Sequence, residues 1–461
     1  ATVAKGNFAE TNKPLRLGHT DNISNFLNGS VGEVRIFAEK LSASEFTIQR
    51  DSMTNRWLGE APTLPVMPEK DVFTITELLN WSPATDPDSP FKVATVPLQS
   101  RINVPAALKA NANAKSGQGG IQPLDFYAGS RPQGQAGSVY AMTYWQYVQE
   151  AVYWAGVGAD IFNPPTCEMV DCAHRNGIPI LGTIFFAPTV YGGDYTRVQT
   201  FLTKSGNAYP AADKLIEMAN HYGFDGWFIN QETAGGNAAD AAAMRDLVRY
   251  IRQNSSLKIS WYDAMNESGS VGWQDRLNTS NDWYMRHNYT NGLQDSAGEL
   301  IADSMFVDFS SDSTTTLPTN SRTRALALAL DPYKIWTGLE TQGEDFKTST
   351  SARIKMAKAF PDGQNHITSV GFYQPKEHAN AIADQDLFWT GASGDPRNTS
   401  ATVGTGAWKG VAHNIAERSV IDSLPFTTDF CTGQGANYYI NGVIAKAGSW
   451  WNRALQGILP T

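Results

Sequence analysis

An amide and a carboxylate stand one residue apart in an otherwise apolar run, Gly223–Thr233, which reads GFDGWFINQET. If the run is a β-strand, Asn230 and Glu232 point to the same side, about 7 Å apart along the chain. Burial raises the pKa of a carboxyl group, which suits a proton donor that works near neutral pH. The pair therefore indicates acid–base chemistry at the end of a buried strand.

The amide of Asn230 limits which kind of acid–base chemistry the pair can perform. A retaining glycosidase normally pairs its acid with a carboxylate nucleophile about 5 Å away, and an amide cannot fill that role. The pair makes sense if the substrate supplies the nucleophile, because a 2-acetamido sugar can attack its own anomeric carbon through the acetamide oxygen. Asn230 would accept the acetamide N–H, and Glu232 would protonate the leaving oxygen. A buried hydrogen bond that merely closes the strand is the structural alternative.

The elements that must hold this pair follow a repeating pattern. From about Val72 onward, apolar runs alternate with segments of helical periodicity, which predicts an α/β fold of the (β/α)₈ TIM-barrel type. The expected strands are 151–156, 178–186, 224–230, 257–263, 305–310, 334–341, 369–375 and 425–430. The helical stripes are Leu215, Met218, Ala219 and Tyr222 before the third strand, and Met244, Leu247, Val248 and Ile251 after it. The long polar loop 265–282 is expected above the barrel mouth.

The N-terminal residues follow a different pattern. Residues 1–60 read as β structure, with alternation through Val31–Phe37 and then a capping box formed by Ser42 and Glu45. This segment resembles the closing strands of a concanavalin-like or laminin-G-like sandwich, so we expect a partial sandwich annex. A Pro-rich linker at 61–71 would join it to a catalytic barrel spanning 72–461. The abrupt start suggests a piece of something longer.

The composition excludes several classes of function. A net charge of −9 argues against a nucleic-acid groove. The sequence contains no apolar run of 18 residues, so we expect no membrane span. The seven histidines lack His-x-x-x-His spacing, so we expect neither a metal nor another cofactor. Cys167, Cys172 and Cys431 form no disulfide framework, and inert buried thiols are expected at the first two. The 13 Trp, 17 Tyr and 21 Phe residues suit a carbohydrate-binding surface.

Longer stretches carry a family resemblance. GFDGWFINQET, YWQYVQEAVYWAG, AHRNGIPILGTIFF, ISWYDAM and LPFTTDFCTGQGANYYINGV together resemble glycoside hydrolase family 85. The similarity covers roughly Val72–Thr461, and INQE and GLETQG look most like the streptococcal endo-β-N-acetylglucosaminidase D branch. Such enzymes cut between the two GlcNAc residues of N-glycan cores, on a TIM barrel. The resemblance thus implies a retaining, substrate-assisted endo-β-N-acetylglucosaminidase.

The resemblance also implies roles for single residues. Glu232 would be the general acid and base, Asn230 would orient the acetamide, and Tyr262 would support the intermediate. Related chitinase-type enzymes carry D-G-x-D-x-D-x-E, and this chain departs from that string at Asn230, as family 85 does.

Four further positions are candidates for substrate binding. Trp273 matches a binding Trp of the family, and Tyr191 and Tyr373 match aromatic positions of its groove. Glu340 is a candidate because it lies at the end of an expected strand, where it could bind mannose hydroxyls or pair with Lys or Arg.

Two other functions stay open at this point. One is a two-carboxylate glycosidase that uses Asp225 or Glu340 as partner, although strand alternation disfavours Asp225. The other is a non-catalytic glycan-binding protein. We expect N-linked glycans of glycoproteins as partners, a monomer, and a secreted or cell-surface bacterial location.

Overall fold

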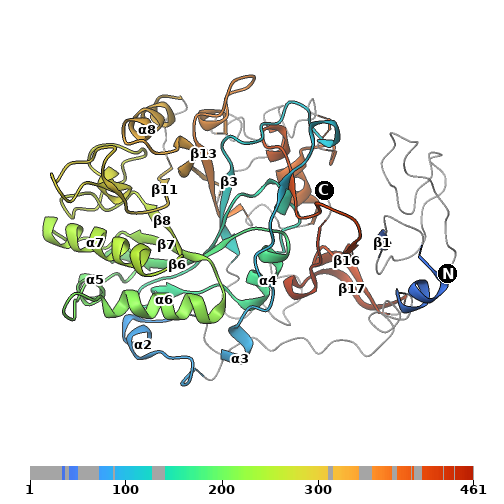
Figure 1. Cartoon of the computed structure of the whole chain (residues 1–461), viewed down its shortest axis with the longest axis horizontal. Helices are drawn as coiled ribbons and strands as arrows, with labels where there is room; N and C mark the ends of the chain where they lie inside the picture. Colours follow the sequence, from blue (N-terminus) through green and yellow to red (C-terminus); the bar gives the residue numbers. More distant parts are fainter. Residues whose placement is uncertain are drawn as a thin grey trace.

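The computed structural model has a closed barrel of eight parallel strands at its centre (Figure 1). It describes residues 34–36, 41–49, 72–86, 89–126, 141–309, 315–341, 356–375, 382–395, 397–398, 408–428, 430–440 and 442–459. The barrel strands are β3 (Ile121–Phe126), β4 (Ala151–Trp154), β6 (Ile180–Phe186), β7 (Gly226–Gln231), β8 (Lys258–Tyr262), β11 (Ser304–Val307), β12 (Ile335–Glu340) and β13 (Ser369–Tyr373). They pair in that order, and β13 pairs with β3 to close the ring. The (β/α)₈ prediction is confirmed.

Helices cover the outside of this barrel. They are α4 (Cys167–Arg175), α5 (Tyr195–Phe201), α6 (Pro210–Tyr222), α7 (Ala238–Asn254), α8 (Thr316–Ala327) and α10 (Ile382–Thr390). Figure 1 shows α6 and α7 side by side against β6, β7 and β8, and Tyr250 of α7 donates to Asp213 of α6 over 2.8 Å. Between β8 and β11 the described chain forms a long loop with a 3-10 turn, η4 (Asp282–Tyr284), and the short pair β9 (Arg286–His287) and β10 (Glu299–Leu300).

The two helices beside β7 form as their sequences predict. All eight residues of the expected stripes on α6 and α7 are fully buried, so both stripes face the sheet. The α7 helix begins at a capping box, in which the Asn237 side chain accepts from the backbone N–H groups of Ala239 and Asp240. The helix therefore starts five residues after Thr233, which keeps the segment after β7 short.

Strand alternation divides the buried residues into two cores. On β7, Phe228 packs inside the barrel, whereas Trp227 and Ile229 pack under the helices. The inner core consists of Leu124, Val152, Leu181, Phe228, Tyr262, Ala264, Phe306 and Trp336. Asn230 and Glu232 have the parity of Phe228, so the strand directs them to the barrel axis, as expected.

Two glycines make room for the Phe306 ring in this inner core. A Cβ on Gly371 would lie 2.0 Å from the Phe306 ring, and one on Gly338 would lie 2.3 Å from the backbone oxygen of Val307. The Phe306 ring therefore occupies the space that side chains from β12 and β13 would otherwise fill.

One expected barrel strand is wrong. The run 425–430 contains β15 (Phe426–Thr428), which pairs antiparallel with β1 (Val34–Ile36) and lies outside the barrel. The missing barrel strand is β3, which contains Pro123 and which the sequence pattern did not predict. The strand that carries Asn230 is consequently the fourth strand of the barrel and not the third.

The N-terminal annex is described only in part. The capping box at Ser42 is confirmed, since its backbone N–H donates to Glu45 over 2.8 Å and the Glu45 N–H returns a bond to the Ser42 hydroxyl. Residues 43–49 are helical. Most of 1–60 and the whole linker 61–71 lie outside the described residues, so the sandwich annex and the domain boundaries stay predictions.

The remaining elements lie around the barrel. They are α2 (Ile75–Asn80), α3 (Ser89–Lys92), β2 (Ile102–Asn103), β5 (Phe162–Asn163), β14 (Arg418–Ser419), β16 (Gln434–Ile440) and β17 (Val443–Trp451). The strands β16 and β17 form an antiparallel ribbon beside the barrel (Figure 1). Of the helices in the described ranges, none combines the length and the apolar character that a bilayer crossing needs.

Candidate active site

Asn230 and Glu232 meet at the carboxyl end of β7. The Nδ2 group of Asn230 donates to Oε1 of Glu232 over 2.8 Å, so the two side chains face each other at the barrel mouth. The backbone N–H of Glu232 donates to the carbonyl of Phe186 on β6 over 2.8 Å, which fixes the end of the strand. Asn230 is buried, and its Oδ1 atom has no hydrogen-bond partner among the described residues.

The surroundings of Glu232 favour its protonated form. Burial is the main cause that raises the pKa of Glu232 above its ordinary value, and the negative charge of Asp308 raises it further. The hydrogen bond from Asn230 and the nearby Trp273 side chain oppose these effects, yet the pKa stays raised. A carboxyl group with this balance can hold a proton for a leaving group at a pH where an exposed glutamate is ionised.

Tyr262 ends the next strand, β8, and faces the same space. Its hydroxyl donates to Oδ1 of Asp308 over 2.5 Å. Burial holds the pKa of Tyr262 well above its ordinary value, and the charges of Asp308, Asp263 and Glu232 add to that effect. Tyr262 therefore keeps its proton and acts as a hydrogen-bond donor.

Asp308 and Asp263 are site residues that the sequence reasoning missed. Asp308 follows β11 with the inward parity of Phe306, and its backbone N–H donates to Oδ1 of Asp263 over 3.2 Å. Asp263 is fully buried, and burial followed by the charge of Asp308 raises its pKa well above the ordinary value. The inward spacing of Phe306 and Asp308 was a signal in the sequence, although the partner of the carboxylate was not visible there.

Aromatic rings form the wall beside the carboxyl groups. Trp154, at the end of β4, packs with ring centroids 5.7 Å from Phe228, 5.0 Å from Phe185 and 5.7 Å from Tyr373. Phe309 lies 5.2 Å from Tyr373. The structure thus brings Tyr373 to the mouth, as expected, and adds Trp154 and Phe309, which the sequence analysis did not single out.

The other expected binding residues differ in their distance from the acid. Trp273, half exposed on the 265–282 loop, is near enough to Glu232 to lower the pKa of that carboxyl group, so this loop reaches the mouth as expected. Glu340 is exposed at the end of β12, beside Tyr373 in the strand register. Tyr191 is 63% exposed in the turn η3 (Thr189–Tyr191) after β6, and no described contact joins it to the acid.

Asp225 is excluded as a second carboxylate. It precedes β7 at the opposite end of the barrel, where its Oδ2 atom accepts from the backbone N–H of Ile180 over 2.7 Å and lies 2.9 Å from Nε2 of His174. Seven residues of extended chain separate it from Glu232, about 20 Å at the usual rise of a strand. The glycosidase alternative built on Asp225 is therefore wrong, and His174 holds Asp225 at the base of the strand.

The thiols of α4 have no catalytic surroundings. Burial raises the pKa of both Cys167 and Cys172 to about 12, so neither forms a thiolate near neutral pH. The described residues contain no group of three or more His, Cys, Asp or Glu side chains placed to hold a metal ion.

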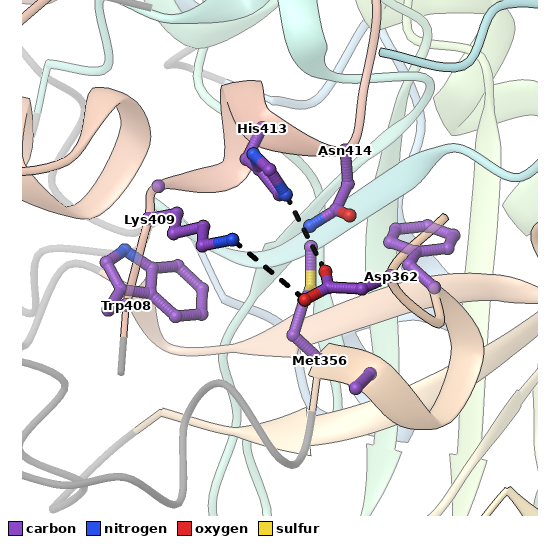
Figure 2. Close-up of a pocket in the computed structure, with 9 residues that line it drawn as sticks. Met356, Asp362, Trp408, Lys409, His413 and Asn414 are labelled. Carbon is purple, nitrogen blue, oxygen red and sulfur yellow. Dashed lines mark ion pairs between the residues drawn. The ribbon is translucent and has the colours of Figure 1, made fainter. Parts of the chain in front are cut away.

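A hollow lies at the other end of the barrel. Figure 2 shows Asp362 between Lys409 and His413, with N–O distances of 3.9 and 3.6 Å. Asn414 also lines it, and its carbonyl accepts from the backbone N–H of Lys115 over 3.0 Å, in the segment that leads into β3. No expected site residue lines this hollow, so we place the candidate active site at the mouth alone.

Known proteins resemble most of this chain. It is 27% identical over 402 residues to the cytosolic endo-beta-N-acetylglucosaminidase of Gallus gallus, which covers 84% of this chain and 47% of that protein. The human protein of the same name is 25% identical over 453 residues, which covers 93% of this chain and 51% of that protein. The solved glycoside hydrolase domain of Endo-D from Streptococcus pneumoniae R6 matches with a TM-score of 0.71 and 27% identity, over 85% of this chain and 61% of that chain.

These comparisons correct one expectation and settle the family. The chain spans about half the length of the curated relatives it matches. The expected secreted or cell-surface bacterial location is contradicted, because the vertebrate relatives are named as cytosolic enzymes. The family model described as glycosyl hydrolase family 85 matches residues 126–438, more than half of the chain and nearly the whole barrel. The protein belongs to glycosyl hydrolase family 85.

Proposed function

We propose that the protein is an endo-β-N-acetylglucosaminidase that hydrolyses the GlcNAc-β-1,4-GlcNAc core of N-glycans on glycoproteins, with retention of configuration. One observation carries the proposal: a buried amide, Asn230, is hydrogen-bonded to the acid Glu232 and keeps its own oxygen unpartnered within the described residues. A buried acceptor without a donor is costly, so its site is suited to a ligand that brings an N–H group.

The reaction then needs no protein nucleophile. The acetamide oxygen of the bound sugar attacks the anomeric carbon, and the bond from that carbon to the leaving oxygen breaks as Glu232 transfers its proton to the leaving oxygen. The positive charge that develops on the acetamide nitrogen is held by its N–H bond to Asn230. Glu232, now ionised, takes a proton from water, and that water opens the oxazoline. Two inversions at the same carbon give net retention.

The neighbouring residues take supporting roles in this proposal. Tyr262 borders the place where the acetamide would lie, because its hydroxyl lies between the end of β8 and Asp308. Tyr373 and Trp273 offer ring surface for sugar stacking near the acid, and the exposed Tyr191 extends that surface along the mouth. Glu340 can accept hydrogen bonds from sugar hydroxyls, for which its exposed strand-end position is suitable.

The alternatives have less support. A purely glycan-binding protein needs no acid with a raised pKa, whereas Glu232 has one beside a buried unpaired acceptor. Glu340 as a nucleophile would have to act from β12, three strands away from β7 around the barrel.

Mass spectrometry tests the proposal directly. Defined N-glycopeptides are incubated with the protein, and we expect a peptide that retains one GlcNAc together with the released oligosaccharide. An unchanged glycopeptide mass contradicts the proposal and favours a glycan-binding protein. Cleavage of a matched substrate that lacks the 2-acetamido group contradicts the substrate-assisted mechanism and favours a protein nucleophile.

A further inference from the structure

Asp308 lies at the centre of the ionisable groups at the barrel mouth. It follows β11 and faces the axis one inward position beyond Phe306, which pairs in register with Tyr262. Its Oδ1 atom accepts the Tyr262 hydroxyl over 2.5 Å, and its backbone is held by the buried carboxylate of Asp263. This carboxylate is therefore fixed on one side and directed at the mouth on the other.

The Tyr262 hydroxyl has one proton, and it uses this proton in a hydrogen bond to Asp308. A phenol offers a single O–H donor, so a hydroxyl that donates to a carboxylate presents only lone pairs to any other neighbour. The hydrogen bond to Asp308 therefore sets which side of the Tyr262 hydroxyl oxygen faces the reacting sugar. Charge-assisted bonds of this kind are stronger than neutral ones, which makes the arrangement persistent.

The charge of Asp308 also reaches the other groups of the site. It raises the pKa of Tyr262, of Asp263, of Asp275 and of Glu232. Burial raises the pKa of Asp308 itself above its ordinary value, and the hydrogen bond from Tyr262 opposes part of that effect. Asn230 carries no charge, so the carboxylates that can offset the positive charge of an oxazolinium-type intermediate are Asp308 and Glu232, the latter once it has given up its proton.

We propose that Asp308 is a positioning residue that acts through Tyr262, holding the Tyr262 hydroxyl so that its oxygen faces the reacting sugar. The proposal rests on the proposed function, because it assigns Asp308 a part in the same reaction. It differs from a purely structural role, since most of the activity lost on removal of Asp308 should depend on the presence of the Tyr262 hydroxyl.

A double-mutant cycle tests this dependence. We expect Asp308→Ala to lower kcat/KM for glycan release by about tenfold or more, the scale of coupling between contacting residues. In the Tyr262→Phe background the same substitution should cost less than about threefold, because the hydroxyl that it positions is gone. Asp308→Asn, which keeps an acceptor oxygen of the same shape, should recover part of the loss. Equal losses from Asp308→Ala in both backgrounds overturn the proposal.

A second measurement does not need activity. The carboxyl carbon of Glu232 is followed by ¹³C NMR during a pH titration, and its signal is assigned with Glu232→Gln. Loss of the Asp308 charge in Asp308→Asn should lower the pKa of Glu232, whereas Asp362→Asn, which removes a carboxylate at the opposite end of the barrel, should leave both that pKa and the activity unchanged. A Glu232 pKa that does not move in Asp308→Asn overturns the placement of Asp308 beside the acid.

The two readouts separate this proposal from the proposed function. If the wild-type protein releases no glycan, the proposed function fails, and the titration still decides whether Asp308 acts on Glu232. If the wild-type protein is active and the cycle is additive, only the role of Asp308 fails.

Discussion

The Asn230 amide donates to Glu232 through Nδ2 over 2.8 Å, while its oxygen stays buried without a partner in the described part of the chain. One side chain thus uses its donor on the acid and keeps its acceptor for a ligand. An aspartate at this position could not donate to Glu232 unless it were protonated, and its charge would raise the cost of ionising Glu232.

Glu232→Gln removes the proton that the leaving oxygen needs and keeps the shape of the side chain. We expect glycan release to fall by about 10²- to 10⁴-fold, the usual contribution of a general acid. Initial rates on an N-glycopeptide measure this, with Glu217→Gln on the outer helix α6 as a control for removal of a partly exposed glutamate. A loss smaller than that range would assign the acid to another group.

Asn230→Ala removes the acceptor for the acetamide N–H. Because only oxazoline formation requires that contact, this variant should fail on intact glycans and still accept a preformed sugar oxazoline. Product formation from both substrates is compared by chromatography. Equal loss on the two substrates would contradict this division of roles.

The Trp273 side chain lies near Glu232 and lowers the pKa of that carboxyl group, so loss of its indole N–H should raise that pKa. Activity that depends on protonated Glu232 declines as pH rises through this pKa. In Trp273→Phe the alkaline limb of kcat/KM should therefore move to higher pH, which a pH–rate profile measures. Tyr191→Phe, which has no described contact with the acid, should leave the position of the limb unchanged; a shift there as well would point to a general effect of the mouth.

Glu232 also affects stability as a function of pH. Its pKa in the folded protein is raised above the ordinary 4.5, so the folded state favours the protonated form. The corresponding stability is present at low pH and is lost as pH rises through the folded pKa. Glu232→Gln should therefore have a higher Tm than the wild type at about pH 8, and this difference should shrink towards about pH 4. A constant difference across that range would show that the ionisation of Glu232 carries no cost.

Gly371→Ala tests the packing of the inner core, since its new methyl group would collide with the Phe306 ring. Overpacking of this kind should lower the free energy of unfolding by about 1–3 kcal/mol. Gly272→Ala is a matched control, because its Cβ would meet only Gln274 at 3.7 Å and should change stability by less than about 0.5 kcal/mol. Urea titrations of both variants decide whether the Phe306 contact is as close as described.

The sequence predicted those features of the fold that depend on the residues of a single strand or helix. The stripes on α6 and α7 and the alternation through Phe228, Asn230 and Glu232 are local properties, and the structure confirms them. The strand β3 was missed because Pro123 removes a backbone donor, and such runs are expected at sheet edges. Closure of the barrel makes β3 a central strand, which is a property of the whole sheet.

The sequence likewise predicted the part of the candidate site that lies within one strand, and missed the part that depends on pairing between strands. Asn230 and Glu232 are neighbours in one strand, so their spacing was sufficient. Asp308 joins the site only because the register of β11 against β8 sets Phe306 beside Tyr262, and no pattern within either strand reports that register. The run 425–430 does contain a strand, but its partner is β1, which short-range pattern could not identify.

The strand β7 is tied at both ends: Asp225 is held at the base by Ile180 and His174, and the Glu232 N–H is bonded to Phe186 at the top. Its backbone should therefore rank among the slowest segments in amide hydrogen exchange, opening only with the whole barrel. A sugar that binds to Asn230 and Glu232 consequently has little backbone ordering to impose, and its binding energy remains available for straining the glycosidic bond.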